Sequence, residues 1–238
     1  MRTLVDAAVE YNDEGYLIHS CNYIGAYVRG RTKDEALGKF KDEISRYAMW
    51  STGEYLPVSC AMEINIIQEK KSSLDVADAD SDIIFESELM PINSDEYEAM
   101  KALVLKSAED FELLYKSIPD KGATSLKERK TFYGQVPLTA EEMYVHTNRV
   151  TAYYFGEIGI STDFKSGISN NRTEAFRLAE RIPDYLKNTV HIGAFDELWT
   201  LRKVMRRFIW HDRIHAKAMY RMAVRIWGSY KICNPYFF

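Results

Sequence analysis

The run DELWTLRKVMRRFIWHDRIHAKAMYRMAVRIW, residues Asp196–Trp227, predicts one long amphipathic helix that ends at Gly228. At about 100° per residue, its apolar side chains share one arc of the helix surface, and its lysines and arginines share another. His211 and His215 are four positions apart, so they lie about 40° apart on the helix and within the apolar arc. Both histidines are therefore expected to face a protein core.

Three segments upstream of this helix also show helical patterning. They are Ser94–Ile118, which stops at Pro119, Thr139–Ile158, which stops at Gly159, and Asn171–Asn188, which is interrupted at Pro183. The pattern Thr139-x-x-Glu142 is a capping box that opens the second of them. Four amphipathic helices in succession favour a four-helix bundle over residues 94–238. The 20-residue connection before Thr139 is long enough to cross the bundle.

The N-terminal part predicts a small α/β module over residues 1–72. Strand-like runs occur at Leu4–Tyr11 and Tyr16–Cys21, in a short extended piece between Gly25 and Gly30, and at Glu63–Gln68. Thr32-x-x-Glu35 is a capping box before a helical repeat of apolar residues. Residues 73–93 are polar and acidic and are expected to be a linker, with one possible extra strand at Ile83–Phe85. The fold class is therefore α+β.

Composition describes an ordinary folded protein. The chain has 238 residues, of which 46% are hydrophobic and 28% charged, as in proteins with a substantial core. It lacks a run of about 20 apolar residues, and its start lacks the apolar stretch of a signal peptide. Cys21, Cys60 and Cys233 are odd in number and far apart, which favours free thiols and a cytoplasmic location.

Charge is distributed unevenly along the chain. Residues 72–120 hold thirteen acidic and three basic residues, whereas residues 196–238 hold three acidic and nine basic ones. A basic stripe can bind nucleic acid. Because an acidic segment in the same chain could face the basic one, and because both could simply be solvated, a nucleic-acid partner is not expected.

A candidate metal site rests on three of the five histidines. His146 shares a helix face with apolar residues of the segment 139–158, so it is expected to point into the same interior as His211 and His215. Burying three imidazoles without partners would be costly, and a divalent metal removes that cost. The alternative is that they are hydrogen-bonded core residues. His19, in the N-terminal hairpin, and His191, in a loop, are expected to be structural or solvated.

Three protein ligands and an open fourth position are typical of a catalytic metal. A zinc protease is not expected, because Asp212 replaces the glutamate of such motifs and no His, Asp or Glu follows His215. Glu142 is one turn from His146, but its place in the capping box favours a structural role. Arg207 and Tyr153 are the candidate substrate-binding residues, the first for an anionic group.

Two resemblances to known families add to these predictions. The run GYLIHSCNYIGAYVRGRTKDEALGKFKDEI, residues 15–44, resembles the HicB-like antitoxin fold through a hairpin followed by G-x-T-x-x-E-A-L at Gly30–Leu37. The usual proline before Gly25 and the usual aspartate before Thr32 are missing. This resemblance implies the fold of residues 1–72 and a possible protein partner, since such modules recognise partners or occur as appendages.

Residues 94–238 resemble the DinB-like (DinB/YfiT) superfamily of metal-binding four-helix bundles. The resemblance rests on His146 in AEEMYVHT, on WTLRKVMRRF from Trp199, and on His211-x-x-x-His215. It implies that these three histidines bind a divalent metal, with Zn expected first and Ni, Fe or Mn as alternatives. It also implies a transferase or isomerase that uses a small thiol such as bacillithiol or mycothiol.

The leading hypothesis is therefore a metal-dependent transferase that acts on a low-molecular-weight thiol and an electrophilic acceptor. The alternative is a non-enzymatic binding or regulatory protein, in which the HicB-like module recognises a partner and the metal is structural or sensory. A homodimer is a further expectation, because the apolar faces of such bundles often pair.

Overall fold

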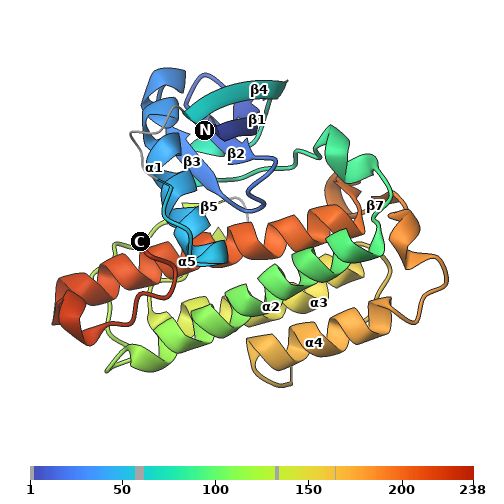
Figure 1. Cartoon of the computed structure of the whole chain (residues 1–238). Coiled ribbons are helices and arrows are strands. Elements are labelled where there is room, and N and C mark those ends of the chain that lie inside the picture. The colour runs from blue at the N-terminus through green and yellow to red at the C-terminus, as the bar shows by residue number, and fades with distance from the viewer. Residues whose placement is uncertain (1–2, 57–61, 132–133, 164) are drawn as a thin grey trace. The chain divides into compact units, whose positions relative to one another are not determined.

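A computed structural model describes residues 3–56, 62–131, 134–163 and 165–238 (Figure 1). The chain divides into two compact units, the first ending at Met90 and the second beginning at Pro91. The first unit contains a four-stranded sheet with one long helix, and the second contains four long helices. The α+β class predicted from the sequence is confirmed.

The first unit has one sheet with strand order β3-β2-β1-β4. Strands β1, β2 and β3 are antiparallel neighbours, and β4 lies parallel to β1 on its other side. Helix α1 packs against β2 and β3. The bounds are β1 Thr3–Tyr11, β2 Tyr16–Ser20, β3 Tyr27–Gly30, α1 Lys33–Thr52 and β4 Met62–Lys71.

The start of α1 follows the predicted capping box. The Thr32 hydroxyl accepts a hydrogen bond from the Glu35 backbone N–H at 3.1 Å, and the Glu35 carboxylate accepts one from the Arg31 N–H at 2.9 Å. Both bonds satisfy backbone donors at the helix entrance that have no partner inside a helix. The apolar face beyond them, including Phe40 and Ile44, is fully buried.

The segment 73–90 packs into the first unit instead of forming the linker and extra strand expected there. It holds two short 3₁₀ helices, η1 Val76–Asp78 and η2 Glu86–Leu89, and residues 83–85 are not in a strand. The Gln68 side chain donates to the Ile84 carbonyl at 2.9 Å. This carbonyl is therefore bonded to a side chain and not to the backbone of a neighbouring strand. Ile83 and Phe85 are buried beside Ala8.

The second unit is built from four helices, α2 Ser94–Ser117, α3 Ala140–Gly156, α4 Ile168–Ala179 and α5 Leu201–Trp227 (Figure 1). Helices α2 and α3 each pack mainly against α4 and α5, so α2 and α3 lie on a diagonal. The connection between them therefore crosses the bundle, as its length predicted. This connection carries the short strands β5 Lys130–Thr131 and β6 Gly134–Gln135.

Two helix boundaries differ from the prediction. Helix α4 begins at Ile168 and ends at Ala179, and only the short 3₁₀ helix η3 Tyr185–Lys187 lies beyond it. Helix α5 begins at Leu201 rather than Asp196, because the Thr200 hydroxyl caps it by accepting from the Lys203 N–H at 3.2 Å. The residues before Thr200 form a small hairpin, β7 His191–Ile192 and β8 Leu198–Trp199, around the 3₁₀ helix η4 Ala194–Asp196.

A buried ion pair joins three of the bundle helices. The two terminal guanidinium nitrogens of Arg172, on α4, donate to the two carboxylate oxygens of Asp212, on α5, at 2.6 Å each. Ser107, on α2, donates to the same carboxylate at 2.7 Å. All three residues are fully buried. Because a bidentate pair fixes direction as well as distance, this contact sets the rotation of α5 about its own axis.

None of the described helices combines the length and the apolar character needed to span a membrane. Of the three cysteines, Cys233 is an exposed free thiol and Cys21 packs beside the cluster of Ala8, Ile83 and Phe85. Cys60 lies outside the described residues.

Candidate metal centre

The structure brings the three predicted histidines together inside the second unit. His146 lies in the second turn of α3, and His211 and His215 lie on successive turns of α5. His211 is buried, with 8% of its surface exposed, while His146 and His215 are partly exposed. The site therefore has a closed side at His211 and an open side toward solvent.

The three rings meet at short distances. The Nε2 atoms of His146 and His211 are 3.0 Å apart. One ligand nitrogen from each ring can be chosen so that all lie within 4.8 Å of one another. Nitrogen ligands around a tetrahedral zinc, with bonds of about 2.0–2.1 Å, are about 3.4 Å apart. The observed separations bracket that value, so these residues can hold a metal ion after small side-chain adjustments.

Electrostatics keeps the three imidazoles neutral. Burial lowers the pKa of His146, and the Arg149 charge lowers it further. Burial also lowers the pKa of His211 well below its ordinary value, with smaller contributions from His215 and His146. Burial and His146 bring the pKa of His215 to about 3. Neutral imidazole is the form that binds metals, so the donor set is already in its ligating state at pH 7.

The ring of His211 also leaves one buried nitrogen without a partner. Its Nδ1 atom has no hydrogen-bond partner among the described residues. A buried core histidine normally has a hydrogen-bond partner for each nitrogen that needs one. Three imidazoles that meet each other, with no carboxylate between them in the described part of the chain, fit a cation better than they fit a self-sufficient hydrogen-bonded core.

Nearby carboxylates have other partners. Asp212, adjacent to His211 in sequence, is held by Arg172 inside the bundle and is not available as a general base. The Glu142 carboxylate accepts from the Leu138 and Thr139 backbone N–H groups at 2.8 and 3.2 Å, which confirms its capping role. Glu157 accepts from the Ala194 N–H at 2.8 Å, away from the histidines.

A cleft of about 690 Å³ opens beside His146. Its lining combines the face of α3 that carries His146 with residues from the connection between α2 and α3. This connection could not be placed from sequence patterns, because its position depends on contacts far along the chain. The lining residues are Glu128, Gln135, Val136, Pro137, Leu138, Glu141, Glu142, Val145, His146 and Arg149.

The two predicted substrate-binding residues lie elsewhere in the unit. Arg207 is buried, with its guanidinium carbon 5.4 Å from the Trp199 ring centre and 4.6 Å from that of Trp210. Tyr153 is 40% exposed and packs against Tyr154 and Trp199. Neither is among the residues that line the cleft. The arginine that does line it is Arg149, which is three positions after His146, a spacing that could have singled it out.

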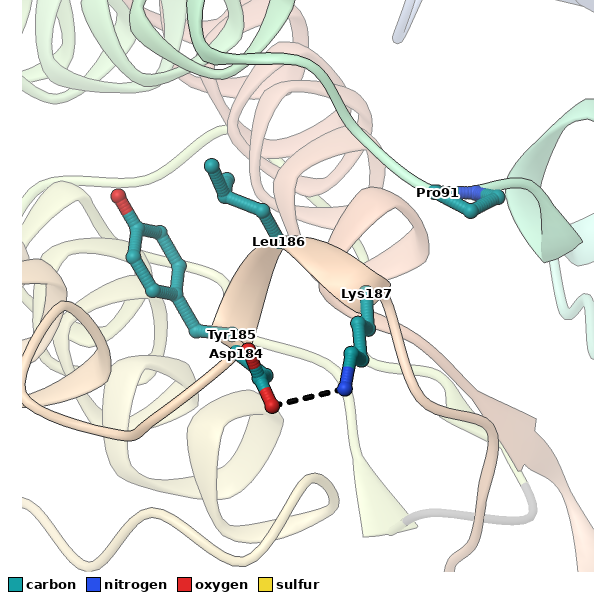
Figure 2. Close-up of a pocket in the computed structure, with 5 residues that line it drawn as sticks. All are labelled: Pro91, Asp184, Tyr185, Leu186 and Lys187. Atoms are coloured by element: carbon teal, nitrogen blue, oxygen red, sulfur yellow. Dashed lines mark hydrogen bonds and ion pairs between the residues drawn. The ribbon is translucent and has the colours of Figure 1, made fainter.

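A second hollow, of about 410 Å³, is lined by Pro91 and residues 184–187 around η3 (Figure 2). The Asp184 carboxylate and the Lys187 amine in its wall form an ion pair at 2.7 Å. These two charges neutralise each other, and no histidine or cysteine lines the hollow. It has none of the metal-binding groups found beside the first cleft.

Comparison with known proteins finds no matching family model, no matching curated protein and no matching solved structure.

Proposed function

We propose that residues 94–238 are a DinB-like bundle that binds one divalent metal through His146, His211 and His215, and that the protein is a metal-dependent transferase of a low-molecular-weight thiol. The observation that carries the proposal is the convergence of three neutral imidazoles from two helices within 4.8 Å, at the edge of a cleft. Zinc is the metal proposed first, since three histidines with an open position suit it. Nickel, iron and manganese are the alternatives.

The bound metal would act as a Lewis acid that keeps a substrate sulfur in its nucleophilic thiolate form at neutral pH. The residues around the three histidines determine how the reactants reach the metal. His211 and the buried face of α5 close one side of the site, so the reactants enter through the cleft beside His146. The thiol loses its proton to solvent, its sulfur forms a new bond to an electrophilic carbon, and the leaving group departs with its electron pair.

The carboxylates on the two helices that carry the histidines are bound to other partners, which supports this chemistry over hydrolysis. A hydrolase would need a group to take a proton from water in the transition state. Asp212, Glu142 and Glu157 are all held by other partners. A thiol does not need a general base in the same way, because its pKa is far lower than that of water and because a metal would stabilise the thiolate charge.

The test is elemental analysis of the untagged protein, compared with the variants His146→Ala and His215→Ala. We expect about one metal per chain in the unmodified protein and a loss of that metal in both variants. Absence of a stoichiometric metal after growth with zinc, nickel, iron or manganese would contradict the proposal. The metal-loaded protein should then consume bacillithiol, mycothiol or glutathione in the presence of electrophilic acceptors.

Chelation separates this proposal from a regulatory protein with a structural metal. A structural metal contributes folding free energy, so its removal lowers the melting temperature greatly. A catalytic metal at the edge of a preformed bundle should leave with a small change in melting temperature and a complete loss of turnover. We propose the HicB-like assignment of the first unit as well, with partner recognition as its function.

A further inference from the structure

We propose that the thiol accepted by this site is a charged one, which carries both a carboxylate and an amino group, with Arg149 binding the carboxylate and Glu128 the amine. This inference rests on the proposed function and names its substrate class. It arises from the cleft beside His146, whose walls carry charges of both signs.

Arg149 is the cationic residue of the cleft wall. It shares a face of α3 with Glu142, Val145 and His146, which all line the same cleft. Its Cα lies about 4.5 Å farther along the helix axis than that of His146. No ion pair joins Arg149 to any acid within the described part of the chain.

Glu128 is the acidic residue of the cleft without a competing role. Glu141 accepts a hydrogen bond from the Tyr115 hydroxyl, and Glu142 caps α3. Glu128 is exposed in the connection between α2 and α3, lines the same cleft, and forms no ion pair or hydrogen bond with another described residue. One cation and one anion thus face the same cleft without neutralising each other.

An uncharged thiol would leave both of these groups solvated and would gain nothing from them. A thiol that carries a carboxylate and an ammonium group would pair with each through charge-assisted hydrogen bonds, which are stronger than neutral ones. Because guanidinium offers two parallel donors to a carboxylate, Arg149 would also orient the ligand, with its sulfur directed to the histidines. The cleft therefore selects for charge, and Arg149 contributes most to that selection.

The test uses the full-length protein loaded with cobalt, which gives an absorption band when a thiolate binds it. Glutathione is the charged probe and 2-mercaptoethanol the uncharged one. We expect Arg149→Gln to weaken glutathione binding about tenfold and to leave 2-mercaptoethanol binding unchanged. Arg149→Lys should restore part of the loss, and Glu128→Gln should weaken only glutathione. Arg181→Gln, on an arginine outside the cleft, is the matched control.

A second measurement separates this inference from the proposed function. S-methylglutathione keeps the charges but has no thiol, and its binding can be followed by calorimetry in the same variants. If S-methylglutathione binding depends on Arg149 while no thiol gives a cobalt band, the charge selection stands and the transferase proposal fails. The inference is overturned if Arg149→Gln changes the binding of both thiols equally or changes the binding of neither. It is also overturned if Arg149→Gln leaves the binding of S-methylglutathione unchanged.

Discussion

Histidines are buried in both units of this chain, and the two environments differ in one respect. In the first unit, His19 is 1% exposed and its Nε2 atom lies 3.5 Å from the carboxylate of Glu10, which is fully buried. In the second unit, the rings of His146, His211 and His215 lie beside one another and form a cluster of possible metal ligands that includes no described carboxylate. A carboxylate lies beside the first histidine, whereas the described residues place none in the cluster of the other three. The first environment contains an acidic partner for its histidine, and the second fits a cation.

The largest expected effect is on metal binding. His211→Ala should lower metal affinity by at least about a hundredfold, because it removes a ligand, and even the outer partners of ligands contribute ten- to a hundredfold. His19→Ala should leave the metal content at one per chain while destabilising the protein. Elemental analysis and a competing chelator measure both. Loss of metal in His19→Ala alone would reverse the comparison.

The next largest effect is expected at the ion pair that orients α5. Asp212→Asn leaves the Arg172 guanidinium charged and buried, so we expect the free energy of unfolding to fall by about 3–5 kcal/mol. Urea denaturation measures this. Asp184→Asn breaks an ion pair that is exposed to solvent, and it should change stability little. Equal effects in the two variants would show that burial of the first pair has no energetic consequence.

The Glu10 environment predicts a pH dependence of stability. Burial opposes ionisation of Glu10, but hydrogen bonding and charge from His19, together with Ser81 and Lys70, outweigh it and lower its pKa from 4.5 to about 2. Because the folded pKa lies below the unfolded one, this stabilisation is present above pH 4.5 and is lost as the pH falls toward 2. Urea titrations between these pH values should show the loss.

Substitution of Glu10 sharpens that prediction. Glu10→Gln should lower the free energy of unfolding at pH 7 by about 3 kcal/mol, since it leaves the other members of a buried network without their anion. It should also flatten the change of stability between pH 4.5 and 2 and leave the metal content unchanged. Glu14→Gln, in the exposed turn after β1, is the control. An unaltered pH profile in Glu10→Gln would assign the dependence to other carboxylates.

The smallest expected effect is at the entrance of α3. Thr139→Ala removes the side-chain acceptor for the Glu142 N–H, which is 3.1 Å away, and should cost about 1 kcal/mol of stability. Glu142→Gln should have an equal or smaller effect and should leave turnover unchanged, because Glu142 acts as a cap. A large loss of turnover with normal stability would instead make Glu142 part of the chemistry.

Local patterns predicted the elements that depend on local physics. The capping residues Thr32 and Thr139 begin helices as expected, and the helical spacing of His211 and His215 brought them to one face. The three-histidine cluster followed from periodicity because each histidine lies on a helix whose apolar face is unambiguous. Those parts of the fold and the site could be derived without coordinates.

Features that depend on distant contacts could not be derived in this way. Residues 196–199 have helical composition but fold into the hairpin before the Thr200 cap. Residues 83–85 have the apolar composition of a strand, but they do not form one. Ile83 and Phe85 are buried in the core, and the Gln68 side chain donates to the backbone carbonyl between them. Only tertiary structure shows that aromatic rings pack around the predicted Arg207, and that Arg149 lines the cleft beside His146.

The diagonal placement of α2 and α3 has a consequence for how this site could diversify. The connection between α2 and α3 has to cross the width of the bundle, so it cannot be shortened to a tight turn unless the helices are connected in a different order. The diagonal placement of the two helices therefore sets a minimum length for this connection. This connection supplies part of the lining of the cleft, while the three histidines lie on helices. Residues of this connection can therefore change part of the cleft lining without any change in the helices that carry the three histidines.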